Sequence, residues 1–145
     1  MALDDDIGNL RRIPLFEDFE TEALRLLAFS AETKLLRAGD ALFRRGEPSD
    51  GGFILTNGSI ALERRDDGRP ADRIVRPFAL LGENAMITQT TRPITAIARE
   101  PATVLKISRA LFHRILEEYP ETAAHVRRRL ATRLEEFARE LTFDA

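Results

Sequence analysis

The chain has 145 residues, a length that fits one domain with a core of its own. Its hydrophobic share of 43% and charged share of 32% are those of a globular protein and exclude global disorder. The absence of cysteine excludes a disulfide scaffold, thiol catalysis and a cysteine-ligated zinc site. The formal net charge of −2 gives no overall basic field for duplex DNA, so we expect no direct DNA binding.

The first residues form an acidic segment without the apolar core of a signal peptide. We predict that residues 1–7 are a disordered tail and that residues 8–145 are a single domain. No stretch approaches 18 consecutive apolar residues, so we expect no membrane-spanning segment. A chain of this kind, free of cysteine, is expected to be cytoplasmic.

Residues 8 to 30 are predicted to be mainly helical, because apolar residues recur there at three- and four-residue steps. Pro14 marks a break near the start of this region. A helix that opens near Thr21 and runs through Leu27 has either Asp18 or Thr21 available as its N-cap.

Residues 32 to 107 are predicted to form β-strands, because turn signals recur at short intervals between apolar runs. Asn57-Gly58, soon after Phe53–Leu55, is the strongest of these signals and predicts a hairpin with the alternating segment that follows. Residues 66 to 70 predict another turn. Several short strands at even spacing indicate an antiparallel, jelly-roll-like β roll, so the fold class is α+β.

Residues 108 to 142 are predicted to form two C-terminal helices, the first capped by Ser108 and ended at Tyr119-Pro120. The second helix runs to about Leu141, and its apolar positions fall on one face. These positions are Ala123, Val126, Leu130, Leu134, Phe137 and Leu141. The face either packs on its own domain or pairs with a second copy, and we predict a homodimer through this C-terminal helix.

The segment from residue 78 to residue 96 carries the candidate chemistry. Gly82 ends a strand and permits a close backbone approach, and residues 83 to 87 can form one short helical turn. Arg92, across a loop, offers a planar fork that suits a phosphate. Glu83 can accept hydrogen bonds from sugar hydroxyls, so the segment as a whole can hold one phosphate and one ribose.

This segment resembles the phosphate-binding cassette of cyclic nucleotide-binding domains. Gly82, Glu83, Arg92 and Thr95 fall in register with the pattern of that family. The flanks are also similar to the family, and the resemblance covers roughly residues 8 to 141. Two sets of residues carry it outside the cassette, namely the turn glycines Gly39, Gly46 and Gly58 and the opening motif Ile13-Pro14-Leu15-Phe16.

The resemblance implies a role for each residue of the cassette. Arg92 would pair with the phosphate oxygens, Glu83 would hold the ribose 2′-hydroxyl, and Gly82 would permit the tight approach. Backbone N–H groups of Asn84 and Ala85 would face the phosphate and ribose. The purine would lie against the β roll beneath the last helix, for which the candidate lid residues are Val126, Arg127 and Leu130.

The chain departs from the family pattern at Asn84, Thr91 and Pro93. Pro93 has no backbone N–H, so one phosphate donor is lost at a cost of about tenfold to a hundredfold in affinity. It also lacks the hydroxyl that would favour guanine. The expected ligand is therefore cyclic AMP, with cyclic GMP as the second possibility, and the predicted ligand-binding residues are Gly82, Glu83, Asn84, Ala85, Arg92 and Pro93.

These features predict a non-enzymatic regulatory domain that relays ligand binding through its C-terminal helix to an effector protein or a second copy. The alternative is an interaction domain with a degenerate pocket, in which Glu83 forms only an internal ion pair with the nearby Arg92. A metal-dependent jelly-roll enzyme needs histidines inside the roll, and residues 32 to 107 contain none.

Three further expectations concern residues outside the cassette. No metal or resident cofactor is expected, and His113 and His125 are interpreted as structural or surface residues. The arginine cluster at residues 127 to 129, set among glutamates, is interpreted as a solvated helix face.

Overall fold

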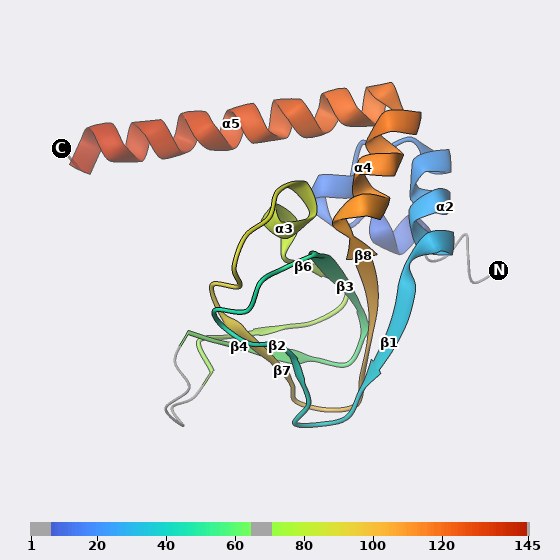
Figure 1. Cartoon of the computed structure of the whole chain (residues 1–145), viewed down its shortest axis with the longest axis vertical. Coiled ribbons are helices and arrows are strands. Elements are labelled where there is room, and N and C mark those ends of the chain that lie inside the picture. Colours follow the sequence, from blue (N-terminus) through green and yellow to red (C-terminus); the bar gives the residue numbers. More distant parts are fainter. Residues whose placement is uncertain (1–6, 65–70, 145) are drawn as a thin grey trace.

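The computed structural model describes residues 7–64 and 71–144, without the side chains of residues 137 and 140–144 (Figure 1). The predicted turn at residues 66 to 70 and all but the last residue of the predicted tail lie outside the described residues. Ile7, that last residue, is helical and 6% exposed in the core. The folded domain therefore includes Ile7.

A small helical layer precedes the strands. Residues 7–10 are helical, and the 3-10 helix η1 (Pro14–Phe16) and helix α2 (Thr21–Ser30) follow. The predicted cap of α2 is wrong, since the N-cap is Glu20 and it makes no side-chain capping bond. The Thr21 hydroxyl instead accepts a hydrogen bond of 2.8 Å from Arg11, which also donates to the Phe19 carbonyl.

The strands form two four-stranded antiparallel sheets in the described part of the chain (Figure 1). One sheet has the order β1-β8-β3-β6 and the other β2-β7-β4-β5. This confirms the predicted antiparallel β roll between an N-terminal helix and two C-terminal helices. The strands are β1 (Glu32–Leu36), β2 (Ala41–Phe43), β3 (Gly51–Asn57), β4 (Ile60–Glu63), β5 (Arg73–Val75), β6 (Ala79–Leu81), β7 (Thr95–Ala98) and β8 (Ala102–Ser108).

The hairpin predicted at Asn57-Gly58 is wrong. A tight turn is present, and Gly58 has the expected positive φ of 90°, but β3 and β4 belong to different sheets. A Cβ on Gly58 would lie 2.6 Å from the Pro101 carbonyl oxygen, so the turn is pressed against the start of β8. The turn therefore carries the chain from one sheet to the other. Gly39 and Gly46 also turn at positive φ, as the sequence predicts.

Three helices complete the domain. The short helix α3 (Glu83–Ile87) lies between β6 and β7, and α4 (Arg109–Glu118) and α5 (Pro120–Asp144) follow β8. The predicted cap of α4 is confirmed, because the Ser108 hydroxyl accepts a hydrogen bond of 3.1 Å from the Leu111 N–H. Figure 1 shows α5 extending past the roll as a long, single helix. Among the described residues, no helix is both long and apolar enough to cross a membrane.

Two apolar clusters lie on opposite faces of the β1-β8-β3-β6 sheet. Ile54 joins the outer cluster, where the sheet packs against the helices, and its neighbour Leu55 joins the cluster inside the roll. This alternation follows from the two-residue period of a strand. Phe16 and Phe112, both fully buried, stand at the centre of the outer cluster. The start of α5 is fixed there too, by Val126.

The apolar face of α5 changes its surroundings along the helix. Val126 is 3% exposed and Leu130 packs against the core, whereas Leu134 is 68% exposed. The side chains of Phe137 and Leu141 lie outside the described residues. The first part of the predicted stripe therefore packs on its own domain, and the homodimer stays a prediction.

Candidate ligand-binding site

The cassette begins at a left-handed turn that only glycine adopts readily. Gly82 has a φ of +82°, directly after β6 and before α3. Met86 of α3 is fully buried in the outer core cluster, and Gly52 of β3 leaves room for it. A Cβ on Gly52 would lie 2.9 Å from the Met86 side chain and 3.0 Å from the Gly82 carbonyl oxygen. The start of the cassette is thus seated directly on β3.

The end of the cassette is held by the loop at residues 46 to 49. The Arg92 N–H donates to the Glu47 carbonyl, and the Gly46 N–H donates to the Arg92 carbonyl, each at 2.8 Å. The Ser49 N–H donates to the Thr90 carbonyl at 2.9 Å. Because these bonds fix the backbone on both sides of Arg92, its side chain has a defined direction.

Arg109, the first residue of α4, joins the two ends of the cassette. Its Nε donates to the Ala85 carbonyl at 3.0 Å, and one terminal nitrogen donates to the Ser49 carbonyl at 2.7 Å. Ser49 in turn bonds Thr90. The sequence did not predict a role for Arg109, whose one local signal is its place as the first residue of the helix that Ser108 caps.

The Arg92 guanidinium is buried and has no carboxylate partner among the described residues. The residue is 5% exposed, and Nη2 donates to the Gly51 carbonyl at 2.8 Å. The guanidinium lies 4.4 Å from the ring centroid of Phe43 and 5.5 Å from that of Phe53. Burial lowers the pKa of Arg92, because removal from water disfavours the charged form. A buried cation of this kind is stabilised by an anion that enters the site.

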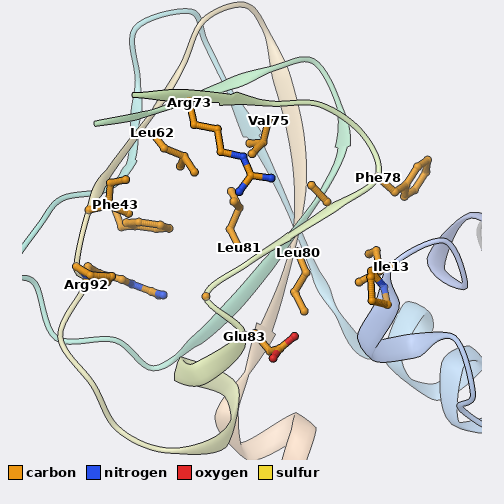
Figure 2. A pocket seen from close by; sticks show the side chains of 15 residues that line it. Ile13, Phe43, Leu62, Arg73, Val75, Phe78, Leu80, Leu81, Glu83 and Arg92 are labelled. Carbon is orange, nitrogen blue, oxygen red and sulfur yellow. The ribbon is translucent and has the colours of Figure 1, made fainter. Parts of the chain in front are cut away.

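A cavity of about 460 Å³ opens in front of Arg92 (Figure 2). Gly82, Glu83, Arg92 and Pro93, four of the predicted ligand-binding residues, line it together. Its other walls are mainly apolar. They include Phe43, Leu62, Val75, Leu80, Leu81 and Ile94. Such a combination of apolar walls with a few convergent polar groups is typical of small-molecule sites.

Arg73 also lines this cavity, and its guanidinium points inward from β5 in Figure 2. Arg73 is not among the site residues predicted from the sequence. The available signal was its spacing of two from the apolar Val75, since residues two apart on a strand share a face.

Both carboxylate oxygens of Glu83 are engaged by the last helix. Oε1 accepts a hydrogen bond of 3.3 Å from Arg129, and Oε2 accepts one from Arg133. Arg133 also donates to Asn84 Oδ1 at 3.3 Å. Glu83 therefore forms an internal ion pair, but its partners are arginines of α5 and not the nearby Arg92 that the sequence suggested. We call the contacts of Glu83 and Asn84 with Arg129 and Arg133 the α5 latch.

The α5 latch corrects the interpretation of residues 127 to 129 as a wholly solvated face. Arg127 and Arg128 are exposed, as the sequence predicts, but the side chain of Arg129 is 33% exposed and pairs with Glu83. Arg129 and Arg133 are four residues apart, so both can reach one carboxylate from one helix face. That spacing is a signal that the two arginines can bind one carboxylate, but it does not predict which carboxylate they bind.

The remaining predicted site residues lie off the main cavity. Asn84 is exposed and Ala85 is 2% exposed, and both line a second cavity of about 420 Å³ on the α5 side of the cassette. The Ala85 N–H, expected to face the ligand, donates to the Gly82 carbonyl at 3.1 Å. Thr95, in register with the family pattern, accepts a hydrogen bond of 2.9 Å from the Arg45 N–H.

The three candidate lid residues do not cover the 460 Å³ cavity in this structure. Val126 and Leu130 pack in the outer core cluster, and Arg127 is exposed. The described residues that line the cavity come from η1, the strands and the cassette, with none from α5. The site is therefore open on this side.

The two histidines contact the domain rather than the cavity. His113 Nε2 lies 3.1 Å from the Ile87 carbonyl oxygen. The His125 ring packs edge-on against Phe19, and its Nδ1 lies 3.8 Å from Asp18. Within residues 7–64 and 71–144, no cluster of three histidine, aspartate or glutamate side chains is placed to hold a metal ion.

Comparison with known proteins gives one family. The family model described as "Cyclic nucleotide-binding domain" matches residues 33–119. The structure of a cyclic nucleotide-binding-like protein from Brucella abortus is 50% identical, with a TM-score of 0.71, over 78% of this chain and 98% of that chain. The N-terminal domain of a transcriptional regulator from Streptomyces coelicolor is 30% identical, with a TM-score of 0.80, over 90% of this chain and 92% of that domain.

The curated relatives are much longer proteins. Lysophospholipase NTE1 of Chaetomium globosum is 27% identical over 108 residues, which make up 73% of this chain but only 7% of that enzyme. The chain also spans 7% of similar enzymes from Neurospora crassa and Aspergillus fumigatus. A segment of this kind therefore occurs within large enzymes as well as at the N-terminus of a transcriptional regulator.

Proposed function

Since the chain belongs to the cyclic nucleotide-binding domain family, we propose that it is a regulatory domain that binds a purine cyclic nucleotide and catalyses no reaction itself. The ligand occupies the 460 Å³ cavity, with its phosphate at Arg92 and its ribose at Glu83. The domain then acts on an effector protein or a second copy through α5.

The single observation that carries this proposal is the state of Arg92. Its guanidinium is 5% exposed, keeps one side-chain hydrogen bond, and faces the cavity beside Gly82. A buried charge without a counter-ion lowers the free energy of unfolding by several kcal/mol. An anion bound beside Arg92 would offset this loss. The remaining donors form a planar fork, which matches two oxygens of a phosphodiester.

The rest of the ligand follows from the shape of the cavity. Glu83 lines the same cavity as Arg92, and its carboxylate suits a ribose hydroxyl, whereas the apolar walls suit a purine. Pro93 offers neither an N–H nor a hydroxyl near the phosphate. The side chain and backbone of residue 93 therefore favour cyclic AMP over cyclic GMP.

The α5 latch supports the relay through the C-terminal helix. The carboxylate assigned to the ribose is the same one that Arg129 and Arg133 hold. A ribose hydroxyl at Glu83 must share or replace these contacts, so ligand binding changes the free energy of the docked helix. The exposed Leu134 lies beyond the latch and suits contact with a second copy or an effector.

Isothermal titration calorimetry with cyclic AMP tests the proposal. The native protein should bind, and Arg92→Ala should bind at least about a hundredfold more weakly, because a charge-assisted bidentate pair is lost. Arg99→Ala, at an exposed position away from the cavity, is the matched control and should bind like the native protein. Equal affinities in all three proteins, or no heat from the native protein with any cyclic nucleotide, would refute it.

The second candidate function is the interaction domain with a degenerate pocket. The observation that favours it is that both Glu83 oxygens and the Ala85 N–H already have partners within the chain. This function predicts no change in melting temperature with cyclic AMP or cyclic GMP, and an effector that binds α5 without ligand.

A further inference from the structure

The β1-β8-β3-β6 sheet ends at β1, which has no strand on its outer side among the described residues. Figure 1 shows β1 along one side of the roll, away from the free end of α5. An edge strand presents unpaired N–H and C=O groups, to which another strand can pair. Of the residues Glu32–Leu36, only Leu36 is buried. The edge at β1 is therefore accessible to a second chain.

Two large apolar side chains lie exposed beside this edge. Leu35 of β1 is 76% exposed, and Phe29, near the end of α2, is 85% exposed. They are the two most exposed large apolar side chains in the part of the chain that the structure describes. Leu36 belongs to the cluster inside the roll, so its neighbour Leu35 points to the outer face of the sheet, on which α2 packs. Both side chains therefore lie on the helical side of the sheet.

The charges of β1 permit pairing with a second copy. A lysine on an edge strand commonly opposes such pairing, but Lys34 stands two residues after Glu32. Neither residue has an ion-pair partner within residues 7–64 and 71–144. When β1 pairs antiparallel with β1 of a second copy, centred on Thr33, Glu32 of each copy lies opposite Lys34 of the other. Opposite charges in this position stabilise the pair of strands.

The charge pattern also selects this register over its neighbours. A centre at Glu32 places two glutamates opposite each other, a centre at Lys34 places two lysines opposite each other, and like charges there are destabilising. A centre between two residues is excluded, because opposed residues must share a face and neighbours on a strand alternate. Around Thr33, Leu35 lies opposite Ala31 of the second copy, with Phe29 of that copy two residues away in the chain. The exposed apolar side chains of both copies therefore gather on one face.

We propose that this chain forms a symmetric dimer through β1, in which the two β1-β8-β3-β6 sheets join into one continuous antiparallel sheet. This surface is separate from the predicted pairing through α5. No described residue that lines the 460 Å³ cavity comes from β1, so the dimer leaves the cavity accessible. It also leaves α5 free to contact an effector protein. The dimer does not depend on cyclic nucleotide binding.

Sedimentation equilibrium of the full chain measures the association. Two short strands and four apolar side chains make a small interface, so we expect a dissociation constant of about 10–100 μM for the native protein. Leu35→Ser should raise this constant at least about tenfold, because exposed apolar surface is no longer covered by pairing. The matched control is Leu134→Ser, at a leucine of α5 that is 68% exposed, and it should associate like the native protein.

The charges give a second test with its own rescue. Glu32→Lys places two lysines opposite each other at both ends of the pairing, and should weaken the dimer about tenfold. Adding Lys34→Glu to Glu32→Lys exchanges the two charges, restores opposite charges across the ladder, and should recover native association. Both positions are exposed, so the variants should keep the native melting temperature.

The register can be tested by a disulfide, because the chain contains no cysteine. Opposed residues of antiparallel strands have Cα atoms about 4.5–5.5 Å apart, which is within the range of a disulfide. Mild oxidation should therefore convert Thr33→Cys to a covalent dimer. Thr132→Cys, at an exposed position of α5, is the control and should stay largely monomeric.

Three results would overturn the proposal. The first is a native protein that stays monomeric up to about 1 mM. The second is a dimer that Leu134→Ser removes and Leu35→Ser does not, which would assign self-association to α5. The third is a charge exchange that fails to restore the dimer, together with no disulfide from Thr33→Cys. None of them bears on nucleotide binding, which the calorimetry with Arg92→Ala tests separately.

Discussion

The α5 latch gives a prediction in which removing an interaction strengthens ligand binding. The perturbation is the double variant Arg129→Gln and Arg133→Gln, which leaves Glu83 without its ion-pair partners. In the native chain the latch must open or rearrange before Glu83 can accept a ribose hydroxyl. The free energy of the latch therefore opposes binding, and the variant no longer has to overcome it.

The magnitude follows from the exposure of the three side chains. They are 17% exposed at Glu83, 33% at Arg129 and 46% at Arg133, so solvent screens both pairs in part. Pairs of this kind contribute about 0.5–1 kcal/mol each, or about 1–2 kcal/mol together. The double variant should then bind cyclic nucleotide about 5- to 30-fold more tightly than a control with the same charge.

The control is Arg127→Gln with Arg128→Gln, two exposed arginines of the same helix. Titration calorimetry gives both dissociation constants, and amide hydrogen exchange should show faster exchange in α5 only when the latch is removed. The difference between the variants should narrow at 0.5 M salt, where exposed ion pairs are screened. Equal or weaker binding by the latch variant at low salt would refute the reasoning.

Three further predictions concern single side chains. Gly82→Ala should lower the free energy of unfolding by about 1–2 kcal/mol in urea, and should weaken cyclic nucleotide binding further, because its φ is +82° and a Cβ would lie 2.7 Å from Arg92 Nη1; unchanged binding would contradict this. Ser108→Ala should cost about 1 kcal/mol through loss of the α4 cap, measured in the same way, whereas Ser108→Asn should cost much less. The hydrogen bond from Lys106 lowers the pKa of Asp50, so the stabilisation is full above the unfolded pKa of about 3.9 and is lost as the pH falls through the lower folded value. The stability difference between native protein and Asp50→Asn, small at pH 7 because Asp50 is exposed, should therefore vanish at strongly acid pH, and a difference that grew there would contradict the assignment.

Local signals in the sequence predicted the features that depend on neighbouring residues. The Ser108 cap, the short helix after Gly82 and the end of α4 before Pro120 each follow from one or two residues, and the structure contains all three. The even spacing of turn signals predicted the β roll, and the family resemblance, whose turns and cassette occur in order, agreed with it. The resemblance also predicted that Gly82, Glu83 and Arg92 share one ligand site, and the structure has all three on one cavity.

Features set by tertiary contacts were not accessible in the same way. Asn57-Gly58 has the residues of a hairpin turn, but tertiary contacts decide which strands pair with β3, and these are β6 and β8 rather than β4. Thr21 can cap α2, but in the structure its hydroxyl accepts a hydrogen bond from Arg11 instead. The partners of Glu83 depend on the direction of α5, which sequence spacing does not fix.

The crossing at Gly58 also bears on how the domain folds. Consecutive strands β3 and β4 do not pair, and the first strand pairs with the last, from Glu32 with Lys106 to Leu36 with Ala102. Such pairings join residues far apart in the chain, so loop-closure entropy must be overcome before most of the sheet contacts form. We therefore expect refolding in milliseconds to seconds. A chain shortened before β8 would lose a central strand and, with it, the site.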